Sequence, residues 1–214
     1  MSMLGRIGTL VAKDVRLEGR TRHTAGMMFV LALLIVVVLS LGAAGRPAGA
    51  GSSALWVAFM FSGILCFERA MRVEREDDAL AAVRLSLASG AEIFAAKLAF
   101  NLIAMTALGA VLIPVAAVFL GLSVRAPVAP SLAVAAMSIV GLSGVGTLFA
   151  AAGSARSSGG LVGLLVLPLT LPLVIAAVRT LESPTPGLGI GILAAFDVIV
   201  LTVGWLAYEF LLEG

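Results

Sequence analysis

The chain offers few residues of the types that carry out chemistry, and they lie far apart in the sequence. Asp197 is an acid inside an apolar stretch, His23 is the only histidine and Cys66 is the only cysteine. A single cysteine allows neither an internal disulfide nor a metal cluster held by cysteines of this chain. No Ser/His/Asp set, carboxylate pair or metal-ligand spacing accompanies these residues, so the sequence predicts no catalytic or metal site.

Each of these residues also has an ordinary structural role. For Asp197 we weigh an interhelical hydrogen bond, a relay or substrate contact, and an error in the helix boundary. His23 could ligate haem iron, but a histidine at the end of a basic helix more often contacts lipid headgroups. Cys66 is expected to be an inert helix residue.

The densest cluster of charge begins at residue 68. It consists of Glu68, Arg69, Arg72, Glu74, Arg75, Glu76, Asp77 and Asp78. Either aspartate can cap a short amphipathic helix whose apolar side carries Leu80, Val83 and Leu85. An apolar ridge flanked by charge suits docking onto a soluble motor protein, because the ridge supplies buried area and the charges set the orientation. A solvated loop between two membrane helices is the alternative.

Pro168 and Pro172 stand four residues apart in an apolar stretch, with Thr170 between them. Each proline removes a backbone donor and costs about 3 kcal/mol inside a continuous helix, so the helix is expected to break or bend. Broken helices at membrane depth often mark a transport path or gate. The alternative is a packing kink that Thr170 or a neighbour bridges.

The amino-acid composition indicates whether these residues lie in a soluble or a membrane protein. Hydrophobic side chains make up 61% of the 214 residues, charged ones 12%, and the mean hydropathy is +1.15. Soluble domains carry about 25% charged residues, so this is a membrane protein. The 24 glycines favour closely packed helices over a β-barrel. The chain has no phosphate-binding loop, so any ATP must be hydrolysed by a partner, and a net charge of +2 does not indicate nucleic-acid binding.

We expect an all-α fold of six transmembrane helices after an N-terminal interfacial helix. Residues 1–24 form that helix, with Leu4, Ile7, Val11 and Val15 on one side and basic residues opposite, although Asp14 and Glu18 interrupt the apolar side. The six-helix transmembrane domain covers residues 25–212, with the cytoplasmic docking helix at about residues 68–89. The predicted spans are residues 25–42, 53–67, 93–120, 132–152, 161–178 and 189–212.

Individual residues add detail to these spans. Lys97 is expected to snorkel to the near interface and Pro114 to kink the third span. A loop with Arg125, Pro127 and Pro130 leads into the fourth span. Close approach of the fourth span to its neighbours is expected at three glycines: Gly141, Gly144 and Gly146.

The positions of Lys and Arg predict the orientation. With the N-terminus in the cytoplasm, 11 of the 14 basic residues lie inside and only Arg46, Arg125 and Arg179 lie outside. The positive-inside rule therefore places both termini in the cytoplasm of a cell-membrane protein.

One stretch is more specific than the rest. Residues 159–173, which include the Leu-Pro-Leu-Thr-Leu-Pro-Leu run at 167–173, resemble the signature of haem exporter protein B (CcmB), the membrane subunit of the cytochrome c maturation ABC transporter. The resemblance extends over nearly the whole chain and includes Trp56, the Glu68-Arg69 pair, Lys97 and the Ala-Phe-Asp-Val run at 195–198.

The resemblance implies an ABC exporter permease that couples ATP hydrolysis by a separate subunit to haem export or to release of a haem-loaded chaperone. The implied partners are a cytoplasmic ABC ATPase, a haem-handling membrane protein, a haem chaperone and membrane lipids, with haem as handled substrate and no tightly bound cofactor. The resemblance also implies site residues. The ATPase-docking helix would include Glu68, Arg69, Glu74, Glu76, Asp77 and Leu80, and Pro168 and Pro172 would lie in the helix that moves when ATP is hydrolysed. A permease for a lipid or another hydrophobic molecule and a non-transporting scaffold are the alternatives.

Overall fold

The computed structural model of the chain describes residues 3–21, 23–42, 50–76, 89–122, 124, 126–155 and 161–213. Within these ranges all regular structure is helical, as predicted. The helices are α1 (Met3–Thr21), α2 (His23–Gly42), α3 (Ala50–Glu76), α5 (Gly90–Leu120), α6 (Val128–Ala155), α7 (Leu161–Glu182) and α8 (Gly187–Glu213).

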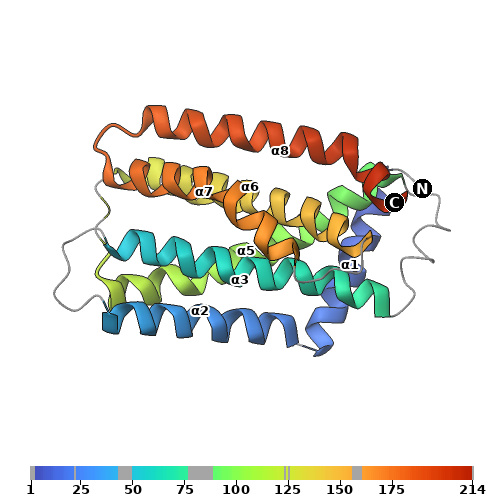
Figure 1. Cartoon of the computed structure of the whole chain (residues 1–214), viewed down its shortest axis with the longest axis horizontal. Helices are drawn as coiled ribbons and strands as arrows, with labels where there is room; N and C mark the ends of the chain where they lie inside the picture. Colours follow the sequence, from blue (N-terminus) through green and yellow to red (C-terminus); the bar gives the residue numbers. More distant parts are fainter. Residues whose placement is uncertain are drawn as a thin grey trace.

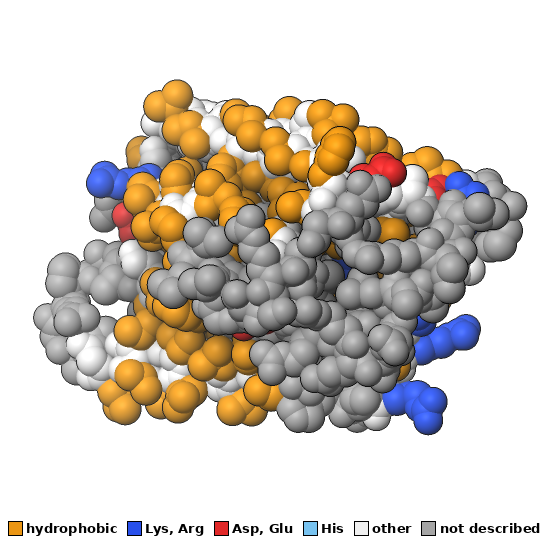
Figure 2. Space-filling view, turned by 45° about the vertical axis from the view of Figure 1, so that its right-hand side comes forward, with side chains coloured by type: hydrophobic (Ala, Val, Ile, Leu, Met, Phe, Trp, Pro, Cys, Tyr) orange, Lys and Arg blue, Asp and Glu red, His pale blue; other side chains and the backbone are white. Residues whose placement is uncertain are grey.

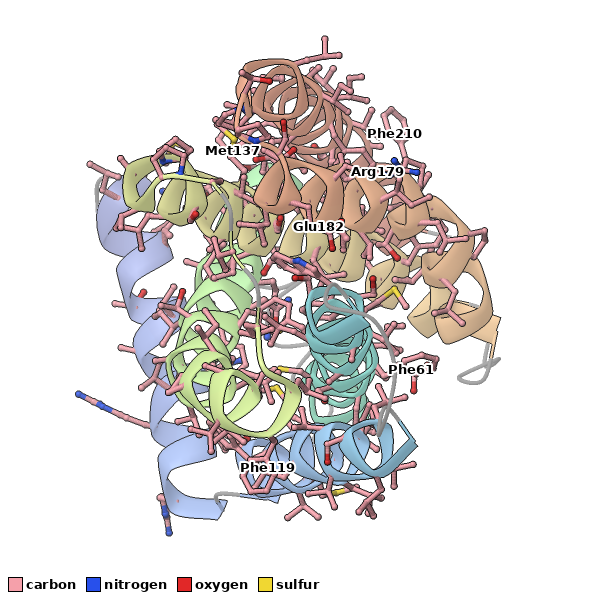
Figure 3. The ribbon with its side chains drawn as sticks, turned by 90° about the vertical axis from the view of Figure 1, so that its left-hand side faces the viewer. Phe61, Phe119, Met137, Arg179, Glu182 and Phe210 are labelled. Atoms are coloured by element: carbon pink, nitrogen blue, oxygen red, sulfur yellow. The ribbon has the colours of Figure 1, made fainter. Side chains whose placement is uncertain are left out.

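Six of these helices lie side by side and alternate in direction, whereas α1 lies across one end of the bundle (Figure 1). We call this end, which also holds both termini, the α1 end, and the opposite one the far end. Viewed from the far end, α2, α5, α6, α8, α7 and α3 follow one another around the bundle (Figure 3). A helix lying across the ends of apolar helices is the arrangement expected of an interfacial helix.

Five of the helices, α2, α3, α5, α6 and α8, contain stretches long and apolar enough to cross a membrane. The chain is therefore a multi-pass membrane protein. The predicted fifth span is helical as α7, but side chains of α7 are described only from Val166 onward. The count of six spans remains a prediction.

Helix α3 differs from the predicted second span. It is 27 residues long and runs through Glu76, so the first part of the charged cluster continues the membrane helix without a break. Helix α6 also begins before the predicted span and includes Pro130 in its first turn, where a missing N–H leaves no hydrogen bond unmade.

The ends of α5 follow recognised capping rules. The Ser89 hydroxyl accepts a hydrogen bond from the Glu92 backbone N–H at 3.3 Å, and the Glu92 carboxylate accepts one from the Ser89 N–H at 3.0 Å. This capping box fixes the first turn of α5. At the other end Gly121 adopts φ +58°, a left-handed conformation that glycine tolerates best.

The predicted close approaches of α6 are confirmed. A Cβ at Gly141 would meet Leu173 of α7 and the Asp197 carboxylate of α8, and one at Gly144 would lie 2.6 Å from Val200. At Gly146 it would overlap the ring of Phe67 in α3. Small residues thus let α6 pack against three helices at once.

Candidate functional site

Four ionisable side chains fasten α1 to the start of α5, and we call them the α1–α5 junction: Arg6, Asp14, Glu92 and Lys97. The Arg6 guanidinium donates to both carboxylate oxygens of Glu92, with Nε at 3.0 and 3.1 Å. Its Nη2 donates to the same carboxylate. Hydrogen bonding to Glu92 raises the pKa of Arg6 above its usual value, so the guanidinium stays charged.

The second pair of the junction is buried. Lys97 Nζ donates to Asp14 Oδ2 at 2.7 Å, and the two side chains are only 7% and 9% exposed. The prediction that Lys97 snorkels to the interface was wrong, because the ammonium finds a carboxylate on α1 instead of water. Asp14 does not merely interrupt the apolar side of α1, since its carboxylate is the partner that Lys97 requires.

The bundle-facing side of α1 overlaps the predicted apolar stripe in part, because Ile7 and Val11 are half-buried whereas the other two residues of the stripe are exposed. Leu4 is 80% exposed and Val15 is 41% exposed. Glu18 joins α1 to the next helix, because its carboxylate accepts a hydrogen bond from the Ala25 N–H in the first turn of α2 at 2.7 Å. This satisfies one of the donors that a helix start leaves open.

Basic side chains gather at the same end of the molecule. Figure 2, which brings the α1 end forward, shows Lys and Arg along its right-hand edge and hydrophobic side chains over the flank of the bundle. A shallow pocket on α1 is bordered by Lys13, Arg16 and Arg20. This distribution suits a helix that lies among anionic headgroups.

The predicted docking residues are only partly within the described chain. Glu68 is half-buried on α3, near the α1 end. Arg69, Glu74 and Glu76 belong to the last turns of α3, and their side chains are outside the description. Asp77 and Leu80 lie outside the described residues altogether. The first residues described after this gap nevertheless form the capping box of Ser89 and Glu92, and Glu92 belongs to the junction.

The two prolines do not break α7, which is continuous from Leu161 to Glu182. Both prolines are on the exposed side of the helix, whereas Thr170 between them is fully buried. The Thr170 hydroxyl bonds to the carbonyl of Val166 at 2.9 Å and lies 3.2 Å from the sulfur of Met60 on α3. Thr170 thus holds α7 to α3, but it does not reach the carbonyls that the prolines leave unpaired, four residues before each.

Asp197 lies well inside α8, which excludes the boundary error that we considered. Its side chain is 9% exposed and faces Gly141 on α6. The expected interhelical hydrogen bond is not seen at Oδ1, which has no partner among the described residues. Pro168, Pro172 and Asp197 do not form one cluster, because the prolines face outward and Asp197 faces α6.

A polar contact that the sequence did not suggest joins α5 to α6. Asn101 Nδ2 donates to Thr147 Oγ1 at 2.8 Å, and the Thr147 hydroxyl donates to the Ser143 carbonyl at 2.6 Å. Asn101 stands one helical turn after Lys97, so α5 presents two buried polar groups on one face. The spacing of four residues between Lys97 and Asn101 was the sequence signal that could have predicted this polar face. Cys66 is buried, as expected of a structural cysteine.

A bundle of apolar helices with an ion-paired helix across one end defines a multi-pass α-helical membrane protein. The chain belongs to the CcmB family: a family model described as CcmB protein matches residues 6–213, nearly the whole chain. This confirms the resemblance to haem exporter protein B and identifies a membrane subunit of the haem export system for cytochrome c biogenesis. No curated protein matches the sequence.

Proposed function

We propose that this chain is the membrane subunit that couples ATP hydrolysis in a separate ABC ATPase to haem export or to release of a haem-loaded chaperone. The α1–α5 junction is the observation that carries this proposal. Residues 68–89 are the proposed docking segment, which ends at Ser89, the N-cap residue in the capping box of α5. Displacement of the segment would therefore act directly on the capping box of Ser89 and Glu92, and on the end of α3 at its other side.

The junction offers a path from there to the rest of the bundle. Arg6 ties Glu92 to α1, and Asp14 ties α1 back to Lys97 five residues further along α5. Glu18 then links α1 to α2. A push on the docking segment would thus move α1 and the starts of two helices together, which is what a coupling element must do.

The finer topology belongs to this proposal. We propose six spans, with α7 as the fifth, and a cell-membrane orientation in which the α1 end faces the cytoplasm. The bias of Lys and Arg toward this end supports that orientation. Proposed partners are the ATPase at the α1 end, a haem-handling membrane protein, a haem chaperone and lipids. The chain itself is proposed to have no catalytic role.

Charge reversal in the docking segment should separate ATP hydrolysis from cytochrome c maturation. We expect Glu74→Lys or Asp77→Lys to weaken ATPase binding by about 2 kcal/mol, or roughly thirtyfold, because a reversed charge opposes its former partner. Co-purification of the ATPase, ATPase activity and mature cytochrome c are the three readouts. The matched control is Glu182→Lys, which changes the same charge at the far end of the bundle.

The same system distinguishes coupling from a scaffold. If maturation survived in the Glu74 and Asp77 variants with the ATPase unbound, docking through this segment would be wrong. If an ATPase variant that binds but cannot hydrolyse ATP still supported maturation, the chain would be a scaffold. CcmB membership favours cytochrome c maturation over the export of an unrelated lipid.

The proline pair is the proposed flexible point of the moving helix. We expect the double variant Pro168→Ala/Pro172→Ala to assemble normally but to lose turnover at least about tenfold, because two restored N–H donors stiffen α7. The control is Leu169→Ala/Leu171→Ala, which alters the same exposed surface and keeps both prolines. Turnover at the wild-type rate in the proline variant would remove the gate hypothesis.

A further inference from the structure

An apolar pocket of about 360 Å³ opens between α5 and α6 near the far end of the bundle. Its rim includes side chains exposed on the outer surface: Ile113, Val128 and Leu132. Its inner wall includes the buried residues Leu55, Trp56, Phe59 and Leu181 from α3 and α7. The pocket therefore leads from the membrane-facing surface to the core, and its volume lies at the lower end of the range for ligand sites.

Trp56 gives this pocket a polar feature. The indole is 6% exposed and packs edge-on against Phe59, with ring centroids 5.7 Å apart and planes at 88°. Its Nε1–H has no hydrogen-bond partner within the described ranges. Buried indole N–H groups usually find an acceptor, because leaving one unpaired costs free energy. Trp56 lines the pocket, so a ligand there would supply that acceptor once a small rotation of the indole turns Nε1, which is sealed from solvent in this structure, toward it.

The remaining lining narrows the chemistry of that ligand. Ser131 is the polar side chain among the described lining residues, and its hydroxyl already donates to the Pro127 carbonyl at 2.9 Å. No described lining residue is charged. The described part of the lining thus suits an apolar chain with one hydrogen-bond acceptor.

The depth of Trp56 also fits a lipid. Trp56 follows the first residue of α3 by six positions, which corresponds to about 9 Å along the helix. Tryptophan is enriched where the headgroup region meets the hydrocarbon. Ester carbonyls of glycerophospholipids lie at this level, and their acyl chains surround the rim residues of a membrane-spanning bundle.

We propose that this pocket binds one acyl chain of a glycerophospholipid from the surrounding membrane. The chain enters between α5 and α6, and its ester carbonyl accepts a hydrogen bond from Trp56 Nε1. The bound lipid fills the space beside α3 and contacts Leu181 of α7, so it links the far ends of four helices. This site is separate from the α1–α5 junction and does not depend on the proposed coupling to an ATPase.

The two tryptophans make the test direct. The full-length Trp205→Phe variant, reconstituted in phosphatidylcholine vesicles, leaves Trp56 as the only indole. Brominated acyl chains quench tryptophan only at short range, so we expect them to quench buried Trp56 through the pocket. Gly109→Leu should relieve this quenching, because a side chain there projects toward the pocket and its nearest neighbour would be 3.6 Å away. Gly191→Leu, at a position with nothing within 4 Å, is the control.

The hydrogen bond has its own test. Ester-linked phosphatidylcholine should be retained about tenfold better than its ether-linked counterpart, which lacks the carbonyl, and Trp56→Phe should abolish the preference. Retention is measured by native mass spectrometry.

Two sets of results would contradict the proposal. If Trp56 were not quenched, or were quenched equally in the Gly109→Leu variant, lipid binding in the pocket would be wrong. If both lipids were retained equally, the hydrogen bond from Trp56 would be wrong. If Gly109→Leu does not fold, Ala135→Leu at the same pocket replaces it.

Discussion

Replacing Lys97 by Met should destabilise the protein by about 3 kcal/mol, because the Asp14 carboxylate would stay buried without its closest cation. Asp14→Leu should cost a similar amount by leaving the Lys97 ammonium in the core. The double variant Asp14→Leu/Lys97→Met should recover most of the loss, since two apolar side chains can fill the same space. Thermal or denaturant unfolding of the purified protein in detergent, arranged as a double-mutant cycle, measures all three values.

Lys13→Met is the matched control for this cycle. Lys13 Nζ also lies near the Asp14 carboxylate, at 3.4 Å, but its side chain is 36% exposed. A cation that water still reaches contributes little to stability, so we expect a change below about 1 kcal/mol. If the two single variants at Asp14 and Lys97 had effects that simply added in the double variant, the pair would not be coupled and the junction would not hold α1 in place.

The α1–α5 junction also shows which property of α1 could not be predicted from the sequence. Helical periodicity correctly predicted that α1 is an amphipathic helix. Figure 1 shows α1 lying across the end of the bundle, as expected of an interfacial helix. Periodicity cannot reveal a partner 83 residues away, so Asp14 looked like an interruption and Lys97 like a snorkelling side chain. An ion pair between Asp14 of α1 and Lys97 of α5 could have been suggested from the sequence, but the sequence alone allowed each of them several other partners.

Other elements were predictable because their cause is local. The small residues of α6 indicated close packing whichever helices became its neighbours, and the structure shows Phe67, Leu173 and Val200 against them. The prolines of α7 indicated lost backbone bonds, but not that Thr170 would contact Met60, 110 residues earlier. The far-end pocket could not be predicted from the sequence, since its lining comes from four helices that are far apart in the chain.

Gly90→Ala should also be strongly disruptive, although it adds one methyl group. Gly90 is the first residue of α5 and packs against the backbone of α8: a Cβ there would lie 2.6 Å from Cα of Glu209 and 2.8 Å from its nitrogen. A side chain can rotate away from such a contact, but backbone of a packed helix cannot. We expect a loss of about 2 kcal/mol or more in the free energy of unfolding, because α5 and α8 must separate.

Gly191→Ala on α8 is the control, since nothing lies within 4 Å of a Cβ at that position and alanine favours a helix over glycine. Unfolding midpoints of the two variants should therefore move in opposite directions. Gly90 lies next to the capping box, so a separation here would also displace Glu92 from Arg6. A Gly90→Ala protein with unchanged stability would mean that α5 and α8 are not in backbone contact at this end, and the start of α5 would then be free to move without α8.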